Sequence, residues 1–247
     1  MPLTFPSHLA PVLPLKLWRP RWFDGVALAT GAVAPDVAYL VAGSDGRTFA
    51  DTHAWPALFW WCLPVALGYA WVFRSSIATV AAQLPPSRRF GWPRYGSLAG
   101  RRHRWWITVS SALLGAGSHL AWDWLTHTDD WLSVVFGVRW SSVTDLPWWT
   151  VSDLTSTLLG AAVVLWCAAR LPRRLAPCAQ APAAVPRRPV LFWSSAGAVA
   201  VVGLLTVPLL PGASLPAPTG VRLIHLAGLA LLAGGLAVRA RPPGPAG

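Results

Sequence analysis

Ionisable side chains interrupt the apolar stretches of this sequence at a few positions, and their types are those that bind metal ions. His119 and Asp123 lie in the run LLGAGSHLAWDWLTH, and Asp36 lies in GAVAPDVAYL. An ionisable residue inside a membrane-spanning helix costs about 2.5 to 3.5 kcal/mol on insertion scales, so it indicates function by default. Neutral imidazole and carboxylate groups bind divalent transition ions, zinc among them. The sequence therefore raises the hypothesis of a metal site.

The spacing of these residues supports a shared ligand. His119 and Asp123 are four residues apart, so on a helix their side chains differ by about 40° around the axis. His127 lies one further turn along, and the remaining ligands must come from other segments, with Asp36 and His53 at comparable predicted depth. An alternative stays open here: His119 and Asp123 hydrogen-bond to each other or to neighbouring helices and only hold the bundle together.

The composition of the chain indicates an integral membrane protein. Of its 247 residues, 54% are apolar and 12% charged, whereas a typical soluble domain has about 25% charged residues. The 20 basic residues outnumber the 9 acidic ones. They lie between apolar runs rather than on one polar domain, so nucleic-acid binding is not expected. The lipid bilayer is the expected surrounding of most of the chain.

Six apolar runs have about the length of a membrane-spanning helix, which predicts an all-α, multi-pass protein of the cell membrane with six transmembrane helices. Seven Arg and no Asp occur in 74–104, five Arg and no Asp in 170–189, whereas 126–152 holds three Asp and one Arg. The positive-inside rule then places both termini in the cytoplasm. The runs are 23–42, 57–73, 105–125, 154–169, 190–210 and 221–238.

A segment rich in Pro and Arg, 171–189, is predicted to be a cytoplasmic linker. It separates the polar region, 1–170, from 190–247, which we expect to be a two-helix membrane scaffold with a short tail. The three cysteines lack metal-type spacing, and no disulfide framework is expected. The first 15 residues contain four prolines and no basic residue, so they are not expected to be a cleaved signal peptide.

Four segments resemble a family of bacterial membrane proteins filed as a domain of unknown function. More distantly, they resemble membrane-bound metal-dependent hydrolases, whose pattern runs His, Pro-Asp, Thr-His-Ser and then Ser-His-x-x-x-Asp-x-x-Thr. In ligand order both are similar to the all-helical zinc-dependent phospholipase C group. The resemblance covers roughly residues 4–165, and SHLAWDWLTH is its most specific piece. The segments are PSHLAPVLPL, GAVAPDVAYL, THAWPALF and LLGAGSHLAWDWLTH.

This resemblance implies a divalent metal, with zinc as the expected ion. In the hydrolase that we favour, Asp123 or Asp153 is the expected catalytic proton acceptor. The sequence departs from the hydrolase pattern because Ala54 replaces the Ser after the second His, the acid after the Pro-Asp pair is missing, and no Glu occurs anywhere. A Glu ligand or Glu general base is therefore excluded, and we expect one or two metals. His127 and Asp153 are outer candidates. The implied metal ligands are His8, Asp36, His53, His119 and Asp123.

Asp153 also has a structural interpretation. It is expected to open the fourth span, where a carboxylate stabilises the N-terminus of a helix without any metal. In this interpretation, loss of its charge lowers thermal stability and leaves metal binding largely intact.

The function expected from these features is metal-dependent hydrolysis of a lipid or phosphoester near the outer membrane face. Two other functions stay open. One is a transporter in which Asp36, His119 and Asp123 form a proton or cation relay, and the other is a non-catalytic membrane scaffold. The sequence has no inverted repeat, which weakens the transporter, and the absence of Glu weakens the enzyme.

The position of His8 conflicts with the charge rule. Lys16, Arg19 and Arg21 are expected inside, whereas the other implied ligands lie toward the outer face. A re-entrant segment through 5–17, kinked at its prolines, would bring His8 back to the site. An N-terminal arm at the membrane interface, with His8 solvated, is the alternative.

Overall fold

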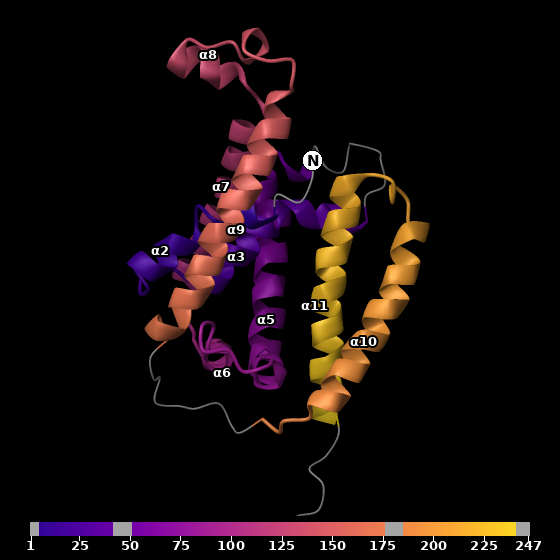
Figure 1. The fold of residues 1–247 in the computed structure, drawn as a ribbon. Coiled ribbons are helices and arrows are strands. Elements are labelled where there is room, and N and C mark those ends of the chain that lie inside the picture. Colours follow the sequence, from indigo (N-terminus) through magenta and orange to yellow (C-terminus); the bar gives the residue numbers. More distant parts are fainter. Residues whose placement is uncertain (1–4, 42–50, 176–184, 241–247) are drawn as a thin grey trace, which may run out of the picture.

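The computed structural model describes residues 5–41, 51–175 and 185–240, and the regular elements in these ranges are all helical (Figure 1). The all-α prediction is confirmed for them. The α-helices are α1 (Phe5–Leu9), α2 (Leu13–Trp18), α3 (Gly25–Val33), α5 (Leu63–Gln83), α6 (Trp92–Tyr95), α7 (Trp105–His127), α8 (Asp130–Phe136), α9 (Trp148–Arg174), α10 (Pro189–Thr206) and α11 (Pro216–Ala240). Shorter elements are η1 (Pro35–Leu40), η2 (Leu58–Cys62), η3 (Gly96–Ala99), η4 (Trp140–Ser142) and η5 (Val207–Leu209).

Four helical segments among the described residues are long and apolar enough to cross a membrane. The predicted run 57–73 continues to Gln83, and the predicted run 154–169 extends in both directions. The first extension is possible because Arg74, which the sequence places in a basic loop, is neutralised inside the bundle by Asp24. The fifth long helix, α7, has 23 residues and carries the polar residues of interest. The four spans are Leu58–Gln83, Trp148–Arg174, Pro189–Leu209 and Pro216–Ala240.

The predicted continuous helix over 23–42 is wrong. The helix α3 has nine residues, about 14 Å, which is half the thickness of the hydrocarbon core. Pro35 then ends the α-helical pattern because it has no backbone N–H to donate. Ala34 N donates to Gly31 O and Val37 N to Ala34 O, so the chain tightens into the 3₁₀ helix η1. This change of helix type determines where the next residue, Asp36, lies.

The N-terminal segment enters the bundle, as the re-entrant interpretation predicts. The helix α1 packs on α9 so closely that a Cβ at Gly160 would lie 2.6 Å from Ser7 Cα. His8 is 2% exposed, so the solvated arm is excluded. Lys16, within α2, packs against Gly25, where α3 begins. The segment, which is rich in proline, forms the two short helices α1 and α2 instead of one longer helix.

The helices α3 and α7 are in direct backbone contact. A Cβ at Gly31 would lie 2.1 Å from Ala112 O, and a Cβ at Gly115 would lie 2.3 Å from Leu28 O. Small residues permit this approach, as in other helix pairs of membrane proteins. The contact fixes the end of α3, and with it η1, relative to the middle of α7.

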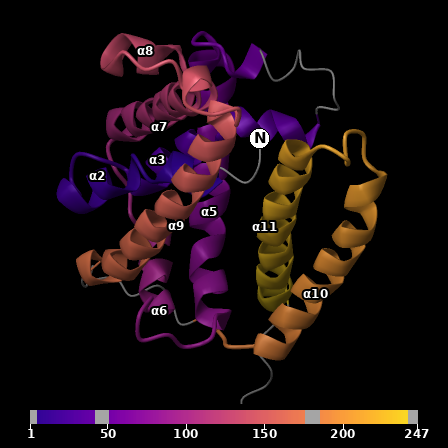
Figure 2. The same ribbon diagram turned by 45° about the horizontal axis from the view of Figure 1, so that its top comes forward.

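The last two long helices form a hairpin beside α5, with α10 on the outer side (Figures 1 and 2). Phe192 is fully buried and packs with Val80 and Val238. Gln83 donates to Pro186 O at 2.9 Å and accepts from Arg188 N at 2.8 Å. The hairpin is therefore attached to α5, while the division into parts at 171–189 stays a prediction.

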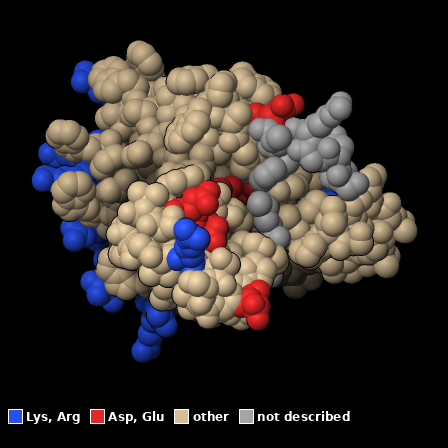
Figure 3. All heavy atoms as spheres, turned by 90° about the horizontal axis from the view of Figure 1, so that it is seen from above, with Lys and Arg blue, Asp and Glu red and all other residues tan. Residues whose placement is uncertain are grey.

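The two ends of the bundle differ in charge. In Figure 1, α8 lies at one end, and α6 lies at the other, beside the C-terminal end of α9. The view onto the α8 end shows acidic side chains over the middle of this face and basic side chains mainly along one edge (Figure 3). The Arg-rich segment that carries α6 follows α5 at the opposite end. Under the positive-inside rule, the Arg-rich end that carries α6 would face the cytoplasm. The cytoplasmic placement of the termini stays a prediction.

Candidate metal centre

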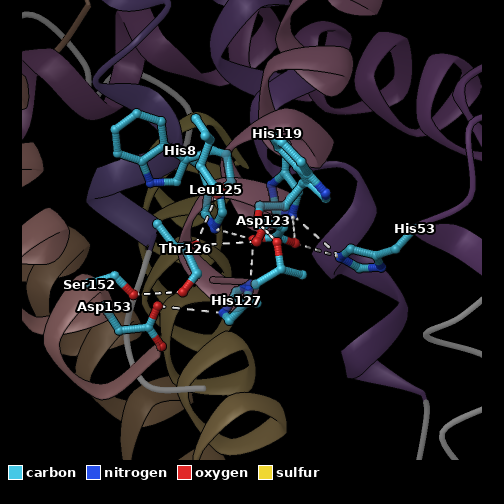
Figure 4. A network of polar contacts seen from close by, with 12 residues as sticks. His8, His53, His119, Asp123, Leu125, Thr126, His127, Ser152 and Asp153 are labelled. Atoms are coloured by element: carbon cyan, nitrogen blue, oxygen red, sulfur yellow. Dashed lines mark hydrogen bonds and ion pairs between the residues drawn. The ribbon is translucent and has the colours of Figure 1, made fainter. Parts of the chain in front are cut away.

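Four separate segments bring the five implied ligands together. His119 and Asp123 come from α7, Asp36 from η1, His8 from α1, and His53 from the segment that precedes η2. Figure 4 shows His8, His53 and His119 around Asp123. Two sets of three have their ligand atoms within 4.8 Å of one another, and both include His119. The sets are His8, Asp36 and His119, and His53, His119 and Asp123.

His119 is fully buried and held in one orientation. Its Nδ1 lies 2.7 Å from the carbonyl oxygen of Ala32, the residue beside the α3–α7 contact. A carbonyl only accepts hydrogen bonds, so Nδ1 carries the proton and the neutral ring leaves Nε2 bare. Metal-ligating histidines usually have this second hydrogen bond. The bare Nε2 lies 3.3 Å from Asp123 Oδ2 and 3.6 Å from Asp36 Oδ1.

His53 faces the same point from the opposite side. Its Nε2 lies 3.3 Å from His119 Nε2 and 3.3 Å from Asp36 Oδ1. Its Nδ1 is 3.2 Å from the hydroxyl of Thr52. A cation between the two Nε2 atoms would be stabilised by both lone pairs and by the neighbouring carboxylates.

His8 covers the inner side of this group. Its ring stacks on that of His119, with ring centres 3.8 Å apart and planes inclined by 17°. Its Nε2 lies 3.6 Å from Asp123 Oδ1. The structure therefore places His8 with the other implied ligands, although more than 100 residues separate it in the sequence from His119 and Asp123 of α7.

The charges and distances fit a divalent cation. Within the described ranges, the carboxylates of Asp36 and Asp123 lie within 3.3 to 3.7 Å of histidine nitrogens and form no ion pair with Lys or Arg. With neutral histidines, the two carboxylates carry two negative charges that a divalent ion would balance. Tetrahedral ligands at 2.0 to 2.2 Å from zinc are separated from one another by about 3.3 to 3.6 Å. The shortest ligand-to-ligand separations here, 3.3 and 3.6 Å, fall at these values.

A second pair extends the group toward α9. His127 Nδ1 lies 3.5 Å from Asp123 Oδ1, and its Nε2 lies 3.4 Å from Asp153 Oδ1. The Ser152 hydroxyl donates to Thr126 O at 2.6 Å, which holds α9 against the end of α7 (Figure 4).

The predicted position of Asp153 at a helix start is wrong. The helix α9 begins at Trp148, after Pro147, so Asp153 lies inside it and not at its N-terminus. Its side chain is 1% exposed and faces His127. The helix begins earlier than the predicted run 154–169 because Trp148 and Trp149 belong to it, together with the polar residues that follow them.

The surroundings of the cluster include groups that the ligand pattern did not identify. A cavity of about 570 Å³ borders His53 and Asp123 and is otherwise lined by Trp55, Leu120 and Trp124. Both indoles are largely exposed, at 62% and 55%. The sequence could have pointed to these two residues, because tryptophan near the end of a predicted span favours the membrane interface. It could not have pointed to the Ala32 carbonyl, because a backbone acceptor does not depend on the side chain.

The model of the family described as Domain of unknown function (DUF4184) matches residues 1–235. The chain belongs to this family. The match extends beyond the 4–165 of the resemblance and includes α10 and most of α11, so the C-terminal hairpin is part of the DUF4184 domain. No curated protein and no solved structure matches the chain. Since the DUF4184 description assigns no function, a functional inference has to come from the residues themselves.

Proposed function

We propose that this DUF4184 protein is a membrane-embedded hydrolase that uses a divalent metal, zinc in the first instance, to cleave an ester or phosphoester. The ligands in this proposal are His8, Asp36, His53, His119 and Asp123. The observation that carries it is the convergence of these residues around His119, whose Nδ1 is held by Ala32 O at 2.7 Å.

The residues around the cluster supply the rest of the chemistry. When bound, a divalent ion polarises the scissile ester and lowers the pKa of a water molecule. The Asp123 carboxylate lies between the histidines and accepts a proton at Oδ1, facing His127 Nδ1 at 3.5 Å. His127 takes the proton onward, and the buried Asp153 carboxylate stabilises the imidazolium at 3.4 Å. Asp153 would orient His127 in the way that the aspartate of a catalytic triad orients its histidine.

The substrate in this proposal is amphiphilic. The cavity beside His53 and Asp123 has a polar base and indole walls, from Trp55 and Trp124. Indole rings favour the level of lipid headgroups in a membrane. A lipid ester or phosphoester would place its polar bond over the cluster and its chain beside the exposed indoles.

The proposed orientation places the cluster toward the outer leaflet. The long helices α5, α7, α9, α10 and α11 cross the membrane, and α3 with η1 takes the place of a further crossing. The connection that carries α6 is Arg-rich, and that carrying α8 contains three Asp and one Arg, which supports this orientation. Reporters fused at residue 95 are expected to be cytoplasmic and at residue 140 extracytoplasmic. The reverse pattern would contradict the orientation and leave the site chemistry intact.

The test of the hydrolase uses full-length protein in detergent, stripped with a chelator and reloaded with zinc. Hydrolysis of a chromogenic phosphodiester and of a fluorogenic phospholipid is measured for wild type, Asp123→Asn and the control Asp130→Asn, whose side chain is exposed on α8. We expect zinc-dependent turnover in wild type and the control, and none in Asp123→Asn. Tight zinc binding without turnover of either substrate class would refute the hydrolase and retain the metal site.

A second candidate function rests on one specific observation. Asp36, His119, Asp123, His127 and Asp153 form an unbroken row of contacts between 3.3 and 3.6 Å, which is a suitable path for a proton or cation. Proton flux in sealed vesicles, abolished by His127→Ala in protein that binds no metal, would favour this relay over the hydrolase.

A further inference from the structure

A second cavity lies between α2, α3, α5 and α9, on the side of the bundle that carries α6. Its volume is about 210 Å³, which compares with about 30 Å³ for one water molecule in the liquid. An apolar space of this size favours an apolar occupant over water. Most of its lining is aliphatic or aromatic, and the lining includes Leu13, Val26, Phe73, Leu98, Val164 and Leu171.

Asp24 and Arg74 border this cavity but neutralise each other. The Arg74 guanidinium donates to both carboxylate oxygens of Asp24, at 2.7 and 2.6 Å. Thr108 donates to Asp24 Oδ2 at 2.8 Å, and the backbone amides of Val26 and Ala27 cap Oδ1. This pair therefore leaves no net charge for a ligand.

Lys16 adds a positive charge at the same border. Its ammonium group donates to Pro20 O at 2.7 Å and Phe23 O at 2.8 Å, and lies 3.1 Å from His103 Nε2. Burial is the main reason that the pKa of Lys16 is lowered to about 8; the Asp24 charge raises it, and the Arg101 and Arg74 charges lower it. The field at the cavity border is therefore positive.

Arg101 is a further cation at the border of this cavity. Its side chain lines the cavity and its Nε is buried without a hydrogen-bond partner. Across the part of the chain that the structure describes, no acidic side chain forms an ion pair with Arg101. A guanidinium stays charged at any physiological pH, and a buried Nε–H without an acceptor is unfavourable.

We propose that this cavity binds the anionic head of a membrane amphiphile, with Arg101 contacting the carboxylate or phosphate and the chain lying along the apolar wall. Fatty acids and anionic phospholipids share this chemistry. The site is separate from the proposed metal centre and does not depend on its function. It lies at the end with the Arg-rich segments, which the charge rule assigns to the cytoplasmic leaflet, where anionic lipids are concentrated.

The test measures lipid binding to the full chain in a neutral detergent by native mass spectrometry. The probes are oleate, dioleoylphosphatidylglycerol and the zwitterionic dioleoylphosphatidylcholine. We expect wild type to retain an anionic probe, and Arg101→Gln to bind it about ten-fold more weakly because a charge-assisted hydrogen bond is lost. The matched control is Arg102→Gln, since Arg102 is the exposed neighbour and does not line the cavity; its affinity should equal that of wild type.

The pattern of retention separates the two sources of the anion. Oleate alone indicates a fatty acid, phosphatidylglycerol alone indicates a phospholipid, and Arg101-dependent retention of either supports the proposal. Equal retention of phosphatidylcholine, or equal affinity in wild type and Arg101→Gln, would overturn it. Ala29→Leu, which narrows the cavity, is expected to abolish retention as well. Since Arg101→Gln removes an unpaired charge, its melting temperature should not fall, and its binding can be measured on folded protein.

Discussion

Two buried polar clusters lie toward opposite ends of the same pair of helices, α3 and α7, and they differ in what completes them. At the start of α3, Asp24 receives two hydrogen bonds from Arg74 and one from Thr108. Beyond the end of α3, Asp36 Oδ1 lies 3.3 Å from His53 Nε2 and 3.6 Å from His119 Nε2. In the first cluster the protein itself supplies the counter-charge of the carboxylate, whereas in the second the negative charge is surrounded by imidazoles.

This difference separates a structural cluster from a binding cluster. A guanidinium beside a carboxylate balances its charge and donates hydrogen bonds to it, so this carboxylate needs no further cation. Neutral imidazoles beside two carboxylates leave the charge uncompensated and direct lone pairs toward one point, which suits a divalent cation. The same residue type, Asp, is therefore structural at one end and a candidate ligand at the other.

The largest expected effect is on the structural cluster. Arg74→Ala leaves the buried Asp24 without its counter-charge, and breaking a buried ion pair costs about 3 to 5 kcal/mol of unfolding free energy. Denaturation of detergent-solubilised protein measures this loss, with the exposed Arg88→Ala as the control. Zinc bound per folded chain should be unchanged. Stability equal to that of the control would contradict the structural assignment.

The next effect concerns the binding cluster. Asp123→Asn keeps the size of the side chain and removes one of the two charges that balance the cation. Outer-shell changes lower metal affinity by about 10- to 100-fold, so loss of a direct ligand should cost at least about 100-fold. Competition with a chromogenic chelator measures the affinity, and the metal-free variant should be no less stable than wild type. If Asp123→Asn unfolds the protein while binding zinc normally, the two clusters have been assigned the wrong way round.

A smaller effect is expected at Asp153, and it reverses the interpretation based on helix capping. Because the carboxylate faces His127 at 3.4 Å from within α9, Asp153→Asn should lower metal affinity about ten-fold. It should also lower kcat more than it raises KM, since the proton acceptor loses its partner. A change in melting temperature alone, with affinity and kcat at wild-type values, would return Asp153 to a structural role.

The smallest effect tests the contribution of the re-entrant segment. A Cβ at Gly160 would meet Ser7 Cα at 2.6 Å, so Gly160→Ala should push α1, and with it His8, away from the cluster. We expect zinc affinity to fall a few-fold while the other ligands remain in place. Gly68→Ala is the matched control, because nothing lies within 4 Å of its Cβ position. Identical affinities in the two variants would remove His8 from the ligand set.

The sequence predicts the ligands of α7 well, for a physical reason. Ionisable residues inside apolar runs are costly, and the four-residue spacing of His119 and Asp123 needs only a regular helix to bring them together. Asp36 and His53 are predicted as further ligands because their expected depth in the membrane is similar to that of His119 and Asp123. Their convergence with α7 agrees with that expectation, and their roles as metal ligands stay predictions.

The features that the sequence did not predict have different physical causes. Arg74 was counted with a basic loop, since only the structure shows that Asp24 neutralises it within the bundle. The break at Pro35 was not recognised in an otherwise apolar run. For His8 the sequence left a re-entrant segment and a solvated arm open, and the contact of α1 with Gly160, which decides between them, has no local pattern.

The most direct test of the central claim is the metal content of the full-length protein, purified in detergent without chelators and dialysed against metal-free buffer. Elemental analysis by inductively coupled plasma mass spectrometry gives the ratio of metal to chain. The account predicts one or two equivalents of a divalent transition metal, zinc first, in wild type and in Arg74→Ala that remains folded, and less than a tenth of an equivalent in Asp123→Asn (about 100-fold weaker binding). Folded wild type that neither retains nor takes up a divalent metal would contradict it.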